Sequence, residues 1–166
     1  MDVGPADVAT FFLRRKCPLL TTYIYIRKGD TTMKCAEVVK ESLESTMEDI
    51  NALWKAYCNG EEEVEDLGRF EEYGLSFDFV APDTFEDQDE GYFRYQISWG
   101  GPSTEFRFYT DATLEPYKVE YWHLDWFDGA SLTLYDEDKA TLLEIFEMFK
   151  ECGTVEHVLE EAMEGA

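Results

Sequence analysis

Residues 92–109 read YFRYQISWGGPSTEFRFY, and this stretch decides the fold class. Apolar residues recur at every second position on both sides of the Gly100-Gly101-Pro102 turn: Phe93, Tyr95, Ile97 and Trp99 before it, and Phe106 and Phe108 after it. A period of two is typical of antiparallel strands that bury one face and expose the other. The stretch therefore predicts two strands joined by a turn.

The same period extends outward in both directions from this hairpin. It predicts a strand at residues 75–79, a fourth at about 117–126 and a fifth at 130–134. The alternation of the fourth strand breaks between Tyr121 and Trp122, which predicts a strand that is buried on both sides or bulged. Asp128-Gly129 is a strong signal for the turn into the fifth strand.

Helical periodicity flanks the strands. Residues 35–58 carry one apolar stripe at spacings of three and four: Val39, Leu43, Met47, Ile50, Trp54 and Tyr57. Asn59-Gly60 ends this helix, and residues 61–66 form a short acidic helix or a loop. A second helix is expected at about 137–151, and a third, capped by Thr154, through about 163. The prediction is an α+β fold with a four- to five-stranded antiparallel meander and all helices on one face.

Charge is high and unevenly distributed. The 166 residues hold 37 acids and 14 bases, a formal net charge of −23, yet 16% are aromatic, which argues against disorder. Residues 1–34 have six bases and three acids, whereas residues 35–166 have 34 acids and eight bases, a net charge of −26. We expect a basic and apolar N-terminal extension (1–34) followed by one acidic domain (35–166). Direct binding to nucleic acid or anionic lipid is disfavoured, because both need Lys and Arg.

The extension has two interpretations. Lys28-Gly29-Asp30 lies at a suitable distance before Met33 for its codons to form a ribosome-binding site, so Met33 is a candidate natural start and residues 1–32 an over-extended gene start. The alternative is an added edge strand at residues 22–26. The pattern lacks the features of a secretory signal, and no apolar run approaches the roughly 20 residues of a membrane span. We therefore expect a cytoplasmic protein with free thiols.

Candidate sites for chemistry are weak. The four cysteines and two histidines have no zinc-finger spacing. His123, Asp125 and Asp128 are a candidate metal set, but the favoured interpretation is an outward His123, a turn that begins at Asp128 and an Asp125 that caps it. The loop at 83–90 fails the EF-hand pattern and is interpreted as a solvated charge run, with weak cation binding left open. The Trp and Tyr residues of the strands are interpreted mainly as core. We predict no catalytic residue, metal or cofactor.

Two blocks, residues 92–109 and 119–130, resemble small acidic uncharacterised proteins of phages and conjugative elements. The resemblance covers about residues 75–150. It implies a mobile-element origin and supports Met33 as the start. Because those proteins have no assigned function, no functional residue carries over.

The predicted function is that of a non-enzymatic acidic protein-interaction domain. Its most concrete form is a DNA mimic that inhibits a host defence or DNA-binding protein, since the carboxylates are numerous enough to imitate a short duplex. The partner is then a protein, in this form a basic nucleic-acid-binding one. The alternatives are a partner unrelated to DNA that binds an exposed aromatic patch, and, least favoured, a carboxylate-based metal-dependent enzyme. The candidate interaction surface comprises Glu41, Glu44, Glu48, Glu61, Glu62, Glu63, Glu65, Asp66, Glu71, Glu72, Asp83, Glu86, Asp87, Asp89 and Glu90.

Overall fold

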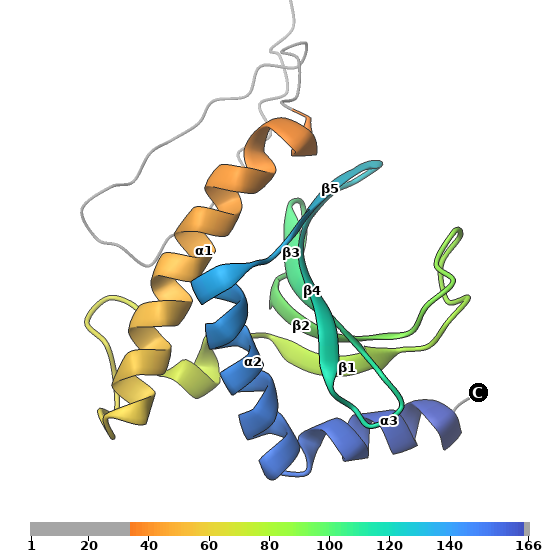
Figure 1. The fold of residues 1–166 in the computed structure, drawn as a ribbon. Helices are drawn as coiled ribbons and strands as arrows, with labels where there is room; N and C mark the ends of the chain where they lie inside the picture. The colour runs from red at the N-terminus through yellow and green to blue at the C-terminus, as the bar shows by residue number, and fades with distance from the viewer. Residues whose placement is uncertain (1–33, 165–166) are drawn as a thin grey trace, which may run out of the picture.

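The computed structural model describes residues 34–164, which form an α+β fold with a five-stranded antiparallel sheet. The elements in chain order are α1 (Cys35–Cys58), the 3-10 helix η1 (Phe70–Glu72), β1 (Ser76–Val80), β2 (Tyr92–Ser98), β3 (Ser103–Thr110), β4 (Pro116–Asp125), β5 (Asp128–Thr133), α2 (Asp136–Glu151) and α3 (Thr154–Glu164). The strands lie in sequence order, β1 to β5, as in a meander. The predicted fold class is confirmed, and Figure 1 shows the helices on one side of the sheet. The predictions for residues 1–33 lie outside the described residues.

Helix α1 has the predicted bounds, but its burial is wider than the predicted stripe. Every stripe residue is buried or half-buried except Tyr57. Leu53 and Ala56, which the stripe does not include, are also buried. The reason is that the chain after α1 folds back along this side of the helix, where the Glu61 amide donates to the Ala56 carbonyl at 2.9 Å. Residues 61–66 form a loop, so the helical alternative for them is wrong.

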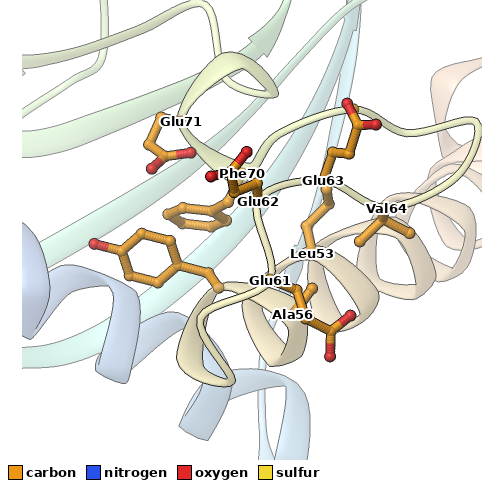
Figure 2. A pocket seen from close by; sticks show the side chains of 10 residues that line it. Leu53, Ala56, Glu61, Glu62, Glu63, Val64, Phe70 and Glu71 are labelled. Carbon is orange, nitrogen blue, oxygen red and sulfur yellow. The ribbon is translucent and has the colours of Figure 1, made fainter.

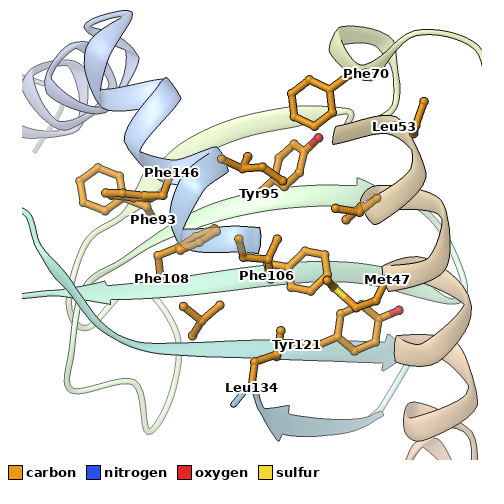
Figure 3. Packing of buried hydrophobic residues seen from close by; sticks show 14 of the residues in the cluster. Met47, Leu53, Phe70, Phe93, Tyr95, Phe106, Phe108, Tyr121, Leu134 and Phe146 are labelled. Atoms are coloured by element: carbon orange, nitrogen blue, oxygen red, sulfur yellow. The ribbon is translucent and has the colours of Figure 1, made fainter. Parts of the chain in front are cut away.

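The core lies between the sheet and the helices α1 and α2, and aromatic rings fill much of it. Phe146 of α2 packs against three strands: its ring centroid lies 5.0 Å from that of Phe108, 5.5 Å from that of Phe93 and 6.1 Å from that of Phe77. Figure 3 shows Phe146 against Phe93 and Phe108 inside the cluster. Much of the high aromatic content thus serves packing, as predicted.

The turn between β4 and β5 lies two residues before its predicted place. Asp125 pairs with Asp128, so Trp126 and Phe127 are the two central residues, and Gly129 lies within β5. The prediction of a turn at Asp128-Gly129 is therefore wrong. A tertiary contact accompanies the observed register: the Asp128 carboxylate accepts a 2.7 Å hydrogen bond from the Cys35 amide at the start of α1. An amide at this position lacks an intrahelical acceptor, and a carboxylate also complements the positive end of the helix dipole.

Strand β4 alternates without interruption. Val119, Tyr121 and His123 are buried on the face that the helices cover, while Trp122 is half-buried on the other face. Neither alternative for the break at Tyr121 is therefore confirmed: the pairing of β3 with β4 is regular there, and the strand is buried on the helix side and only half-buried on the other. The interpretation of His123 as an outward residue is wrong. Its side chain follows the parity of Tyr121, and its Nδ1 lies 3.0 Å from Ser42 Oγ of α1.

Helices α2 and α3 are found where the sequence predicts them, with Gly153 between them at a φ of +74°. Thr154 is not the cap of α3. The Gly153 carbonyl accepts the first helical hydrogen bond, from the His157 amide at 3.1 Å, so Thr154 is already the first helical residue. Glycine ends α2 readily because it adopts a positive φ without steric conflict.

Candidate functional site

All fifteen acidic residues of the predicted interaction surface are exposed, and they form two groups. Strand β1 separates the groups, because it carries the chain from η1 at one end of the sheet to the β1–β2 loop at the other (Figure 1). The first group, the α1–η1 acidic surface, comprises Glu41, Glu44, Glu48, Glu61, Glu62, Glu63, Glu65, Asp66, Glu71 and Glu72. The second group, the β1–β2 loop acids, comprises Asp83, Glu86, Asp87, Asp89 and Glu90.

On α1 the carboxylates lie on the face opposite the core. Glu41, Glu44 and Glu48 follow one another at spacings of three and four residues, and this periodicity places them in one line. Lys40 lies 3.7 Å from Glu44, and both side chains are exposed, so their ion pair is weak. The line does not run on to the end of the helix, since Lys55 follows on the same face.

The loop after α1 adds carboxylates around the last helical turns. Figure 2 shows Glu61, Glu62, Glu63 and Glu71 beside Phe70 and Ala56, with their carboxylates pointing in different directions. The hollow between them has a volume of about 10 Å³, which is the space of one water molecule. Among residues 34–164 no group of three His, Cys, Asp or Glu side chains converges enough to hold a metal ion. The acids here form a surface rather than a pocket.

The β1–β2 loop is organised by an amide, not by its acids. The Gln88 Oε1 accepts hydrogen bonds from the backbone amides of Thr84 and Phe85 at 3.1 and 3.2 Å. The Gln88 Nε2 donates to the carbonyls of Ala81 and Glu90 at 3.1 and 2.6 Å. These four bonds close the loop while its carboxylates stay in solvent, which agrees with the interpretation of a solvated charge run.

The three residues of the candidate metal set have separate structural surroundings. Burial lowers the pKa of His123, and the nearby Asp125 opposes this effect in part. The Asp128 carboxylate caps α1, and the hydrogen bond from the Cys35 amide lowers its pKa. Because His123 faces α1 and Asp128 faces the helix start, the structure does not gather the set around one centre.

The sheet face opposite the helices carries a network that sequence reasoning missed. The Arg107 guanidinium lies over the rings of Tyr92 and Trp122, 4.5 and 3.9 Å from their centroids, and donates to Glu105 Oε1 at 2.7 Å. The Tyr92 hydroxyl is buried and has no hydrogen-bond partner. Alternation reveals which residues share this face, but not that their rings and cations stack, since stacking depends on strand register.

Each base on the strands is paired with an acid on this same face. Arg94 contacts Asp78 through a 3.0 Å hydrogen bond, and Lys118 lies 3.4 Å from Glu120. Stacking single-stranded bases on a sheet needs exposed rings together with cations that are free to meet phosphates. Here carboxylates engage the three cations, so the face does not combine exposed rings with free cations.

The aromatic residues do not all belong to the core. Tyr92, Tyr95, Tyr109 and Tyr121 are buried as predicted, whereas the side chains of Trp99 and Trp126 are 77% and 81% exposed. Phe127 is fully exposed. The exposure of Trp126 and Phe127 can be predicted from the sequence only if the β4–β5 turn is placed at these two residues, two positions before Asp128-Gly129.

Among the thiols that the structure describes, Cys35 is buried, and Cys58 and Cys152 are exposed and free. No described helix is long and apolar enough to cross a bilayer. No protein family, curated protein or solved structure matches this chain.

Proposed function

We propose that this chain is a non-enzymatic protein-interaction domain that binds a basic partner protein through the α1–η1 acidic surface. The observation that supports the proposal is the lack of local neutralisation. Within residues 34–164, only Glu44 and Glu71 of the fifteen candidate acids have an ion pair, with Lys40 and Arg69 at 3.7 and 3.9 Å. Carboxylates without nearby cations give a strong negative potential, which steers and binds a positively charged surface.

Solubility alone does not require so much charge. A net charge with a magnitude of about 2–8 is enough to keep a small domain in solution, whereas this chain has −23. Close like charges on a helix also destabilise it slightly. A functional role for the excess acids therefore explains the composition better than solubility does.

DNA mimicry is the stricter form of this proposal. On α1, Glu37, Glu41, Glu44 and Glu48 span eleven helical steps, or about 16 Å, which is one charge per roughly 5.5 Å. A DNA strand has one phosphate per about 3.4 Å of axis. The helix alone is thus less dense than one strand, and a mimic needs the loop carboxylates at 61–66 to contribute. The resemblance to phage and conjugative-element proteins is the reason to propose a host defence or DNA-binding protein as the target.

The metal-dependent enzyme alternative has no supporting geometry in the described part of the chain. The aromatic-patch alternative does have supporting geometry, because the residues Trp99, Trp126 and Phe127 are exposed. The two interaction hypotheses are compatible, since an acidic body and an aromatic contact can serve one partner.

The test is capture of partners by the full chain at about 50 mM and about 500 mM salt, two conditions that differ strongly in screening. Two variants each remove five negative charges, from different surfaces of the protein. One neutralises Glu41, Glu48, Glu61, Glu62 and Glu63 to Gln, and the other replaces Asp83, Glu86, Asp87, Asp89 and Glu90 by Asn or Gln. We expect basic proteins to be captured at low salt, lost at high salt, lost by the first variant and retained by the second.

A DNA mimic gives one further result: added duplex DNA displaces the chain from the captured protein. Capture that is indifferent to salt, or equal losses in the two variants, would contradict binding through the α1–η1 acidic surface. Capture confined to proteins that do not bind nucleic acid would contradict mimicry alone.

A further inference from the structure

Two neighbouring turns at one end of the sheet carry exposed aromatic side chains. Trp99 begins the β2–β3 turn, and Trp126 and Phe127 form the β4–β5 turn. Because Ser103 pairs with Leu124, both turns leave the sheet at the same end. They also lie close together: a Cβ placed on Gly101 would lie 3.1 Å from the Trp126 Nε1, which is tighter than an ordinary contact. We name Trp99, Trp126 and Phe127 the aromatic tip.

The aromatic tip works against the stability of the fold. Trp126 has a φ of +49°, a region that bulky side chains rarely adopt and that favours Gly or Asn in a two-residue hairpin turn. The three side chains are mostly or fully exposed, so they bury little apolar area in return. Strained residues and exposed apolar clusters of this kind concentrate at binding sites. Trp is also among the residues that most often dominate binding energy at interfaces.

The charges beside the tip indicate what it binds. Asp125 and Asp128 flank Trp126 and Phe127 in the chain. The Asp128 carboxylate is engaged with the start of α1, so Asp125 is the acid that a partner meets beside the tip. A complementary surface has an apolar pocket edged by Lys or Arg. An anionic membrane is disfavoured, because a chain with a net charge of −23 is repelled by it.

We infer that the aromatic tip is an anchor that inserts into an apolar pocket, edged by basic residues, on a partner protein. The inference deepens the proposed function, on which the basic character of the partner rests. In this arrangement the α1–η1 acidic surface contributes long-range attraction, and the tip contributes the desolvated contact that sets how long the complex lasts.

The first test needs no partner. The double variant Trp126→Gly/Phe127→Ser introduces the residue types that a two-residue hairpin turn favours. We expect its urea midpoint to equal or exceed that of the wild type, because strain is relieved and almost no burial is lost. The control is Tyr135→Ser, a change of an exposed aromatic residue elsewhere. A midpoint of the double variant well below both would show that the tip holds the fold together, and would overturn the inference.

The second test locates the contact. A photo-cross-linking residue is placed at Phe127 of the full chain in cells, and at Phe85, an exposed aromatic of the β1–β2 loop, as the matched control. We expect position 127 alone to cross-link a basic protein. After purification of that protein, we expect Trp126→Gly/Phe127→Ser and Trp99→Ser each to weaken binding at least tenfold at low and high salt. Asp125→Asn is expected to weaken it at low salt only.

Several outcomes overturn the inference: no cross-link at position 127, a cross-link only to a second copy, equal affinity of the tip variants, or sedimentation of the wild type with phosphatidylcholine vesicles. A different result would contradict the proposed function. If neutralising Glu41, Glu48 and Glu61–Glu63 leaves the affinity unchanged while the tip variants lose it, the tip stands and the α1–η1 acidic surface does not. The reverse pattern rejects the tip alone.

Discussion

Replacement of Arg107 by Met is expected to be strongly destabilising, because it leaves a buried carboxylate without its cation. The Glu105 side chain is 3% exposed and the Arg107 side chain 13%, and they share a 2.7 Å contact. Methionine replaces most of the apolar stem of arginine but neither the charge nor the hydrogen-bond donors. The Glu105 carboxylate then loses the cation that contacts it, and only Arg94, on the same face, still acts on it at longer range.

The size of the effect follows from this burial. Removing one partner of a buried ion pair costs about 3–5 kcal/mol. The guanidinium also leaves the rings of Trp122 and Tyr92, each contact worth about 0.5–1 kcal/mol at a partly exposed site. With a urea dependence of about 2 kcal/mol per molar, the midpoint is expected to fall by at least about 1.5 M.

Arg94→Met is the matched control. Arg94 and Asp78 form the same kind of pair on the same face of the sheet, but their side chains are 23% and 36% exposed. Such a pair contributes about 0–1 kcal/mol, so the midpoint is expected to fall by less than about 0.5 M. The double variant Glu105→Gln/Arg107→Met is expected to recover much of the loss, since it buries no charge.

The assay is urea unfolding at neutral pH, followed by tryptophan fluorescence and by circular dichroism. Coincident curves from the two probes support two-state analysis. If Arg107→Met and Arg94→Met shift the midpoint equally, or if Glu105→Gln gives no recovery in the double variant, burial does not govern the energetics of this network.

Three further predictions concern the core and its edges. Burial holds the pKa of His123 below its ordinary value of 6.5, so the unfolded chain takes up a proton that the folded chain resists. Relative to His123→Asn, the wild type is therefore expected to lose stability as the pH falls from about 7 to about 5, and a difference between the two that does not change with pH would contradict this. Gly74→Ala places a Cβ 2.2 Å from Cε2 of the buried Tyr95 ring and is expected to cost roughly 1–3 kcal/mol in urea unfolding; a loss below about 0.5 kcal/mol would argue against the clash. Phe146→Ala is expected to cost about 3–5 kcal/mol, whereas the fully exposed Phe127→Ala should stay within about 0.5 kcal/mol, and similar losses would rule out the assigned core.

Local periodicity in the sequence predicts most of the fold. The alternation around the Gly100-Gly101-Pro102 turn predicts β2 and β3, and the helical stripe together with the Asn59-Gly60 stop predicts α1. These features are readable because burial on one face repeats every two residues in a strand and every three or four in a helix. The exposure of the candidate acids was predictable for a similar reason, since unpaired carboxylates are rarely buried.

Long-range contacts determine the features of the fold that periodicity does not predict. The turn at Trp126 and Phe127, the capping of α1 by Asp128 and the inward direction of His123 all depend on how β4 and β5 meet α1. The division of the acids into two groups depends on the direction of β1.

The sequence by itself thus determined an acidic α+β domain, because composition and period are local properties of a chain. Only the tertiary structure decided which aromatic residues are packed and which form the exposed tip. That choice depends on strand register and on contacts between residues far apart in the chain, where free energy is gained only once the whole sheet has formed.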